Sequence, residues 1–532
     1  NNGLGTILSG NRNYYLGEGT LNFNQEIGKH SLNAVLGTTY EHFGLNTFSA
    51  GARGFTLADL TYNAIGSGNS ALNQVGSGRA ETRLGSVLGR VNYSFNNRYL
   101  VTVSMRADAS SRFGPNNQVG YFPSLALAWK VTEESFLKDY GWLTELKLRA
   151  SYGAIGNQNI SNFLYTSTFS YGGNIVQGGV RNPAIFPSRS PNPDLKWEAA
   201  VQTDLGVDYA LFDGRLQGSV EYYNRKTSDL LLAVPQPLST GYGNQVRNVG
   251  SVRNSGFEFA LTGGVVRQKN FSWNVNANLT TLENRILSLG GSAPIFAGGG
   301  GNISNASIIR PGASLGNFYG YQVLGVWQQN DDLTQAPVGV KPGDTKYQDQ
   351  NGDNQITDAD RVILGKSLPD FYYGLTNTLQ FKGLSLDVFL EGAQGSSILN
   401  NNLVDSYFPF SFRRNRVAEP LLNRWTPTNP TNEYPSFVNP VSQGQRVVNS
   451  TTVEKADYLR LQSVRLSYNV PLPASKVIKA LGVFLTGQNL FTITNYSGTD
   501  PAANTIGSDI IKIDYASYPR TRTYLAGVNV QF

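Results

Sequence analysis

The 532-residue sequence has no cysteine, two histidines and one methionine, but 58 glycines, 28 tyrosines and 27 phenylalanines. The lack of cysteine excludes a disulfide scaffold, a thiolate zinc site and a cysteine nucleophile, and two histidines leave little room for imidazole metal sites or Ser-His-Asp hydrolysis. A net charge of +6, with 15% charged residues, does not indicate nucleic-acid binding over this length.

No stretch of the sequence reaches the roughly 18–20 consecutive apolar residues of a membrane-spanning helix. A membrane location stays open, because a β-barrel places apolar residues at every second position and satisfies its backbone groups between strands.

Apolar and polar residues alternate along many segments, which is the pattern of a β-strand with two different faces. The last residues give a clear case, because Tyr524, Ala526, Val528, Val530 and Phe532 occupy every second position. Alternation and turn signals together predict about fifteen strands. Their ranges are 16–27, 31–43, 81–94, 98–109, 120–130, 143–155, 198–211, 214–225, 251–265, 270–285, 370–381, 384–395, 458–470, 481–491 and 520–532.

Short and long connections alternate between these strands. The short ones are Gly28–His30, Phe95–Asn97, Phe212–Gly214, Val266–Lys269 and Lys382–Gly383, and the long ones are 44–80, 156–197, 226–250, 286–369, 396–457 and 492–519. The long connections therefore share one side of the sheet, as in outer-membrane barrels with short periplasmic turns. A soluble β-sandwich fits the alternation equally well, but it gives no reason for all long connections to lie on one side of the sheet. The sequence predicts an all-β fold, a transmembrane antiparallel β-barrel in contact with lipid.

Short motifs follow one another in a fixed order from about residue 80 to the end of the chain. They are Arg112-Phe-Gly114, Gly120-Tyr-Phe-Pro123, Asn192-Pro-Asp-Leu-Lys-Trp-Glu198, the run from Gly343-Asp344 through Asp353 to Asp360-Arg-Val-Ile-Leu-Gly365, Arg424-Trp-Thr-Pro427, Asp457-Tyr-Leu-Arg-Leu461, Gln488-Asn-Leu-Phe491, Tyr496-Ser-Gly498 and Tyr518-Pro-Arg-Thr-Arg522. With this order and spread, the chain resembles the SusC/RagA-like TonB-dependent outer-membrane transporters.

The resemblance implies active import of oligosaccharides or peptides across the outer membrane of a Gram-negative-type envelope, energised through TonB. It also implies a SusD-like surface lipoprotein over the external loops, and no enzymatic activity. Members of the family have a plug domain and a TonB-contacting segment before a barrel of about 22 strands. None of these upstream parts is evident in the sequence.

The predicted strand count is odd, whereas a closed barrel of this type has an even number with both ends periplasmic. If the last strand runs inward to Phe532, the first predicted strand also runs inward. We therefore expect residues 1–532 to be the C-terminal barrel portion of a larger transporter, without plug and first strands, and to form an open sheet.

The long connection 286–369 contains a segment, 349–360, with the ligand spacing of an EF-hand-like calcium loop. Asp349, Asn351, Asp353, Gln355 and Asp360 supply oxygen at the required positions, with Gln355 offering its backbone carbonyl. Asn354 replaces the usual glycine and tolerates the left-handed conformation, while Asp360 is shorter than the usual glutamate. The segment predicts a structural calcium site on the outer face. The alternative is a solvated Asx-rich turn.

Aromatic residues and arginines in the long loops are candidates for contacts with substrate or partner: Trp327, Tyr407, Phe408, Arg413, Arg414 and Trp425. Packing of one loop against another is the alternative role for them. For the whole protein, a passive porin or surface adhesin barrel is the main alternative function, and an outer-membrane hydrolase is disfavoured by the two histidines.

Overall fold

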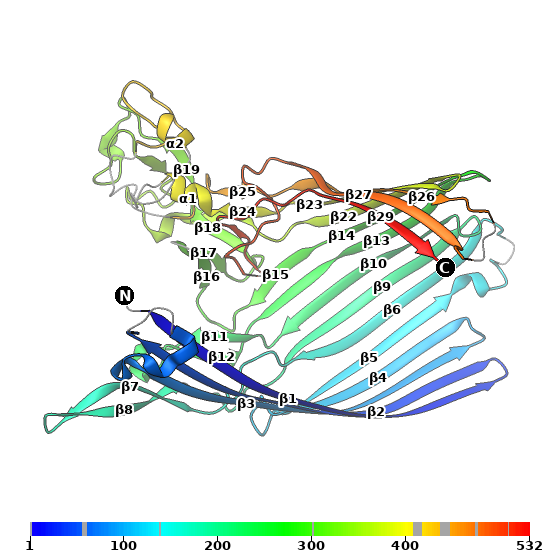
Figure 1. Cartoon of the computed structure of the whole chain (residues 1–532), viewed down its shortest axis with the longest axis horizontal. Coiled ribbons are helices and arrows are strands. Elements are labelled where there is room, and N and C mark those ends of the chain that lie inside the picture. Colours follow the sequence, from blue (N-terminus) through cyan, green and yellow to red (C-terminus); the bar gives the residue numbers. More distant parts are fainter. Residues whose placement is uncertain are drawn as a thin grey trace. The chain divides into compact units, whose positions relative to one another are not determined.

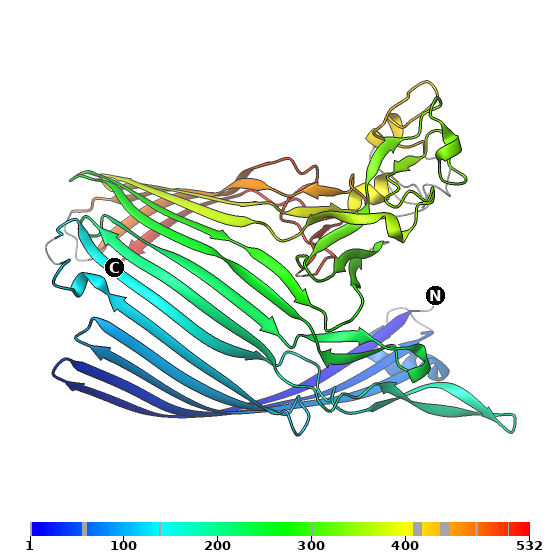
Figure 2. The ribbon, with the colours of Figure 1, turned by 180° about the vertical axis from the view of Figure 1, so that it is seen from behind.

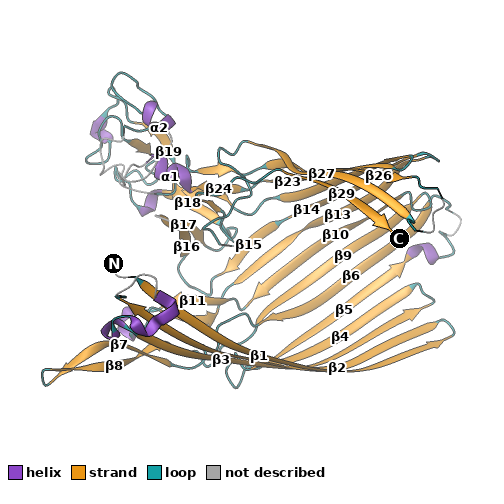
Figure 3. Cartoon of the chain, in the orientation of Figure 1, coloured by secondary structure: helices purple, strands orange, loops and turns teal. Residues whose placement is uncertain are grey.

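The computed structural model describes residues 3–55, 61–137, 140–300, 303–407, 418–436, 447–473, 477–508 and 510–532. The chain divides into two compact units. The first consists of 1–130, 149–203 and 225–251, and the second of 131–148, 204–224 and 252–532. Most regular structure in the described residues is β-strand, with a few short helices (Figure 3). None of the described helices has the length and hydropathy needed to cross a membrane.

The first unit is built on long antiparallel strands in the order β1-β2-β3-β4-β5 (Figure 1). They are β1 (Leu4–Ile27), β2 (His30–Arg53), β3 (Gln74–Phe95), β4 (Tyr99–Ser110) and β5 (Val119–Lys130). Two hairpins belong to its connections, formed by β7 (Thr168–Gln177) with β8 (Val180–Arg189) and by β11 (Leu231–Pro235) with β12 (Asn244–Asn248). Strands β6 (Leu143–Asn157), β9 (Glu198–Leu211) and β10 (Leu216–Ser228) contribute residues to both units.

The second unit has a series of antiparallel strands in the order β13-β14-β22-β23-β26-β27-β29, with β15 paired to β13 (Figures 1 and 2). Their bounds are β13 (Ser251–Arg267), β14 (Phe271–Thr281), β15 (Glu283–Ser288), β22 (Phe371–Phe381), β23 (Leu384–Gln394), β26 (Tyr458–Val470), β27 (Ala480–Thr494) and β29 (Thr523–Gln531). Among the described residues, β1 pairs only with β2 and β29 pairs only with β27, so each of these strands has one unpaired edge.

The long connections of the second unit contain small sheets of their own. One has the order β16-β17-β18-β21, another pairs β19 with β20, and a third has the order β25-β24-β28. Their bounds are β16 (Ile295–Gly300), β17 (Ile303–Ile309), β18 (Asn317–Tyr321), β19 (Val323–Val326), β20 (Thr345–Tyr347), β21 (Arg361–Lys366), β24 (Ser397–Asn400), β25 (Val453–Lys455) and β28 (Ile513–Asp514).

The described helices of the two units are short. They are α1 (Asn401–Tyr407), α2 (Ala418–Leu422) and the 3-10 turns η1 (Thr61–Ser67), η2 (Ser70–Leu72), η3 (Val131–Glu133), η4 (Leu238–Thr240), η5 (Leu333–Gln335) and η6 (Asp358–Asp360).

Tight turns join the long strands at their short connections. Ile27 pairs with His30 across a two-residue turn in which Gly28 has a φ of +58°. Phe381 pairs with Leu384 across Lys382 and Gly383, whose φ values are +46° and +90°. Positive φ at the first central residue, as in the turn of Gly28, or at both, as in the turn of Lys382 and Gly383, matches the twist of a two-residue hairpin, so these turns fix the strand register.

The two faces of the strands in the second unit differ in chemistry. Leu386, Leu466, Leu485 and Ala526 lie opposite one another on four neighbouring strands and form one row. The side chain of Leu485 is 55% exposed and that of Leu466 is 43% exposed. The next row, on the other face, is Ser385, Ser467, Phe484 and Gly527. Extended apolar rows left open on a sheet face are what a lipid bilayer covers.

Each of the fifteen predicted ranges contains a strand, although 270–285 is divided between β14 and β15, and the predicted all-β antiparallel class is confirmed. The first three predicted ranges were too short, since β1 begins at Leu4, β2 ends at Arg53 and β3 begins at Gln74. These added segments are rich in glycine, serine and asparagine and lack strict alternation. Their backbones are nevertheless paired residue by residue with the neighbouring strand, which is a tertiary effect.

Candidate functional site

The long connections of the second unit fold around an apolar core of their own, which we call the loop core. Its buried residues are Ile303, Ala306, Phe318, Leu399, Val404, Val448, Val453, Ile511 and Ile513. They come from three connections that are far apart in the sequence. Complete burial of a side chain such as Phe318 or Ile513 contributes about 1.5–3 kcal/mol, so the loop core gives these segments a fixed structure.

The predicted calcium segment, residues 349–360, forms a hydrogen-bonded loop that we call the Asx loop. Asp349 accepts from the N–H groups of Gly352 and Asn354, each at 2.7 Å. Asp353 accepts from the N–H of Gln355 at 2.8 Å, and the N–H of Asp353 donates to the Asn351 side chain at 3.1 Å. Asn354 has a φ of +58°, the left-handed conformation expected of it.

Asp360 closes the Asx loop from inside the protein. Its carboxylate is fully buried and accepts from the N–H of Gln350 at 2.9 Å and of Thr357 at 2.7 Å, the second bond forming part of the capping box of η6. Among the residues that the structure describes, no group of three or more His, Cys, Asp or Glu side chains is arranged to hold a metal ion. The oxygen donors suit calcium, but several of them already accept main-chain N–H groups, so calcium binding stays a prediction.

A cavity of about 630 Å³ borders the Asx loop. Its apolar lining includes Trp327, Val340 and the exposed Val338, and its polar lining includes Asp353 and Gln355. A volume of this size is within the range of pockets that hold small molecules, which combine aromatic walls with a few polar groups.

Trp327 is fixed in this cavity by its neighbours. The main-chain N–H of Trp327 donates to the Asp344 carbonyl at 2.9 Å, and its main-chain carbonyl accepts from the N–H of Gly343 at 2.7 Å. The Lys346 ammonium lies 4.2 Å from the centroid of its ring and 3.4 Å from Asp331. A cation over the ring face is attracted by the π-electrons, so the indole is held in one orientation.

Trp425, the other predicted contact tryptophan, is a buried packing residue. Its side chain is 6% exposed, and its indole N–H donates to Gln328 Oε1 at 2.8 Å. A Cβ on Gly343 would lie 2.5 Å from the Trp425 ring, so the two motifs that contain these residues pack directly on each other. The interpretation of Trp425 as a substrate or partner contact is not supported by this burial.

The structure gives no side-chain environment for the remaining loop candidates. Phe408, Arg413 and Arg414 lie outside the described residues, and Tyr407 is described only as the last residue of α1.

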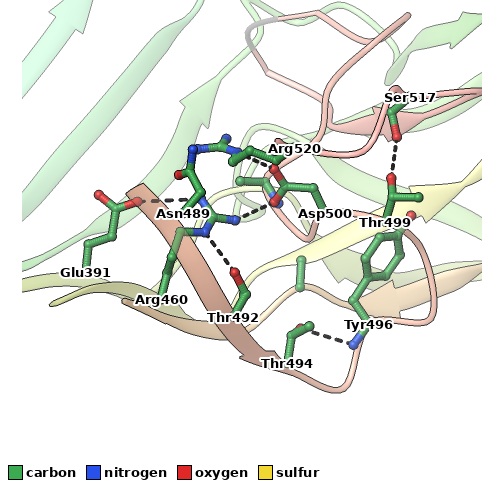
Figure 4. A network of polar contacts seen from close by, with 12 residues as sticks. Glu391, Arg460, Asn489, Thr492, Thr494, Tyr496, Thr499, Asp500, Ser517 and Arg520 are labelled. Carbon is green, nitrogen blue, oxygen red and sulfur yellow. Dashed lines mark hydrogen bonds and ion pairs between the residues drawn. The ribbon is translucent and has the colours of Figure 1, made fainter. Parts of the chain in front are cut away.

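Charged residues meet in a buried cluster at one end of β23, β26 and β27 (Figure 4). Arg460 and Asp500 are 2% and 7% exposed, and Arg460 Nη2 lies 2.6 Å from Asp500 Oδ1. Arg520 Nε lies 2.8 Å from Asp500 Oδ2, and Arg460 also contacts Glu391 at 3.5 Å. Two positive and two negative charges balance in the cluster, so burial of Arg460 is compensated.

Sequence reasoning did not identify this ion cluster, although its members lie in or beside the quoted motifs. Arg460 belongs to Asp457-Tyr-Leu-Arg-Leu461, Arg520 belongs to Tyr518-Pro-Arg-Thr-Arg522, and Asp500 follows Tyr496-Ser-Gly498 by two residues. The presence of a charged residue in two of these motifs, and directly after a third, was the available signal.

A second group of motifs meets in the first unit. Phe113, Leu195 and Trp197 form a buried cluster with Phe122 packed against it. The Trp197 indole N–H donates to the Gln118 carbonyl at 2.9 Å. Motif residues in both units therefore fasten connections to strand ends.

Comparisons with known proteins agree with this architecture. The family model described as TonB dependent receptor-like, beta-barrel, matches residues 2–381. The chain is 35% identical to TonB-dependent receptor P3 of Formosa agariphila over 97% of this chain and 52% of the relative. It is 31% identical to TonB-dependent receptor SusC of Bacteroides thetaiotaomicron over 96% of this chain and 49% of the relative.

A solved structure, described as that of the RagAB peptide transporter, superposes with a TM-score of 0.82 at 26% identity. It covers 99% of this chain and 56% of the solved chain. The chain thus spans about half the length of the curated relatives that it matches.

Proposed function

Because the chain belongs to the TonB-dependent receptor-like β-barrel family of the outer membrane, and is SusC/RagA-like within it, we propose that it forms part of the wall of an active importer. Energy would come from the inner membrane through TonB, which would act on an N-terminal region of the transporter. The superposition of 99% of the chain on the RagAB peptide transporter carries this proposal.

The cargo is an oligosaccharide or a peptide, and a SusD-like surface lipoprotein covers the loops. The described loop segments support a role of this kind, because they are held by the loop core and the ion cluster and present a cavity of about 630 Å³. Loops fixed in this way offer a defined surface to a partner and to a ligand.

Uptake assays test the import function. We expect cells that carry the intact gene, but not cells that lack it, to accumulate a labelled oligosaccharide or oligopeptide, and we expect depletion of TonB to abolish the difference. Accumulation that continues without TonB would favour the alternative, a passive porin. Surface attachment without any accumulation would favour the adhesin.

The lipoprotein partner is tested by purification of the tagged transporter from outer membranes in mild detergent. A SusD-like lipoprotein should copurify in equal amount, and the isolated lipoprotein should bind the purified transporter again. Recovery of the transporter alone under conditions that preserve uptake in intact cells would contradict the partner.

Calcium binding by the Asx loop is a separate proposal, with a structural role for the ion. Titration of calcium into chelator-treated protein should give a Kd of about 10⁻⁴–10⁻³ M, the range of extracellular modules. Asp353→Ala should weaken binding, whereas Asp332→Ala should not, because Asp332 caps the separate turn η5. A titration to 10 mM without a binding signal would end the proposal.

A further inference from the structure

We propose that the cavity beside Trp327 binds a neutral saccharide, with one sugar ring against the indole. This inference rests on the proposed import function, whose cargo it narrows. It combines three observations: a rigid aromatic side chain, an adjacent set of polar groups and a lining with a single charged residue.

The aromatic part of the site is pre-organised. The main chain of Trp327 is held between Gly343 and Asp344, and Lys346 occupies a position over the ring. The C–H groups of a sugar ring are apolar on one side and pack well on an aromatic face. A ring that is already immobilised loses little conformational entropy when a ligand packs against it.

The polar part of the lining comes from the Asx loop, whose backbone is fixed by Asp349 and Asp360. The side chain of Gln355 is exposed and makes no hydrogen bond with another described residue, so it can both donate and accept. The carboxylate of Asp353 can accept from hydroxyl groups. Sugar hydroxyls are donors and acceptors at once, so they complement both side chains.

The charge of the cavity lining favours a neutral sugar over an acidic sugar or a peptide as the ligand. Asp353 is the only ionisable acid or base among the described lining residues besides the phenol of Tyr347, and no lysine or arginine lines the cavity. With no ion bound in the Asx loop, an acidic sugar or the carboxylate of a peptide would meet a like charge at Asp353, and the lysine nearest to Trp327, Lys346, already pairs with Asp331. An apolar peptide side chain packed over Gln355 would displace water from its amide group and give it no partner, which costs binding free energy. A neutral polyhydroxylated ligand avoids both costs.

Binding measurements on the intact protein, purified in detergent, test the proposal. The probes are neutral hexasaccharides (an α-1,4-glucan, a β-1,4-glucan, a β-1,4-xylan and a β-1,4-mannan), an anionic hexaguluronate and a pool of octapeptides. We expect at least one neutral hexasaccharide to bind. Trp327→Ala should weaken it by about tenfold or more, which corresponds to about 1.4 kcal/mol. Gln355→Ala should weaken it by several-fold, and Trp327→Phe should retain most of the affinity.

Trp142→Ala is the matched control, because Trp142 is 52% exposed and lies outside the cavity lining. Its affinity should stay within twofold of the unaltered protein. Absence of binding by every neutral probe, binding insensitive to Trp327→Ala, or Trp327-dependent binding of the peptides or hexaguluronate alone would each overturn the proposal.

Uptake in cells separates this proposal from the proposed function. TonB-dependent accumulation that Trp327→Ala leaves unchanged in rate and in half-saturating concentration would refute the saccharide site and leave import standing. Saccharide binding at Trp327 without any TonB-dependent accumulation would refute import and leave the site standing.

Discussion

Arg460 places a positive charge in a part of the second unit from which water is almost excluded. It lies directly opposite Glu391 on β23 and Thr492 on β27 in the strand register, and its guanidinium also donates to Thr492 Oγ1 at 3.0 Å. Asp500 reaches the same guanidinium from the connection that follows β27. The cluster therefore ties that connection to three neighbouring strands.

Removal of Arg460 from the pair that it forms with Asp500 should loosen the connection that follows β27. Arg460→Leu leaves Asp500 buried with only Arg520 to compensate it, and breaking a buried pair costs about 3–5 kcal/mol. We expect faster hydrogen exchange in residues 495–508. Glu391→Gln is the control, because that contact is longer and more exposed, and it should cost no more than about 1 kcal/mol. Equal exchange in both variants would contradict the role of Arg460.

The Asx loop should respond to pH through Asp349. Burial raises the pKa of Asp349, but hydrogen bonds from the main-chain N–H groups of residues 351–354, above all those of Asn354 and Gly352, together outweigh it, so the net pKa is lowered. A carboxyl with a lowered folded-state pKa stabilises the loop above its unfolded value of about 3.9, and this stabilisation is lost as the pH falls through the folded pKa. Carboxyl ¹³C NMR should give a midpoint below 3.9, and a midpoint at or above that value would contradict the hydrogen bonding.

At the scale of elements, the motifs of the first unit act by close packing between connections. Gly114 lies so near Pro193 that an added Cβ would overlap the Pro193 carbonyl oxygen. This contact brings the motif around Phe113 against the one that contains Leu195 and Trp197. Position 114 therefore has no room for a side chain, and only glycine fits there.

Gly114→Ala should loosen these connections. Overpacking in a closely packed region costs about 1–3 kcal/mol, and we expect faster proteolysis within 158–197. Gly89→Ala in β3 is the matched control, because its Cβ would meet no atom within 4 Å. Similar proteolysis of the two variants would show that the Gly114 contact does not fix the connections.

The long strands could be predicted because each has two faces in different surroundings, so apolar and polar residues alternate along its sequence. The strands inside the long connections could not be predicted, because they lack this alternation. Ile295-Phe-Ala-Gly-Gly-Gly300, for example, forms β16 only because β17 pairs with it. The positive φ of Asn354 followed from local rules, whereas the burial of Trp425 and the ion cluster depend on contacts between distant segments.

At the scale of the whole molecule, the sequence pattern and the family agree on a lipid-covered strand surface. The row that contains Leu466 and Leu485 carries large exposed apolar side chains, and the adjacent row that contains Ser385 faces the other way. In a soluble protein such a row would have to be covered by another layer. In an outer-membrane barrel it needs only lipid.

Charge substitutions on the two rows should therefore differ in their effect on membrane assembly. Leu485→Arg puts a guanidinium on the row that faces lipid, which costs about 2–4 kcal/mol near the bilayer midplane and less toward its edges. Ser385→Arg, almost at the same level, puts the same group on the other face, two residues from Asp387 on the same strand, so it should be tolerated. We expect Leu485→Arg to reduce the heat-modifiable folded form recovered from outer membranes, while Ser385→Arg stays near the unaltered level. Greater loss for Ser385→Arg would reverse the assignment of the faces.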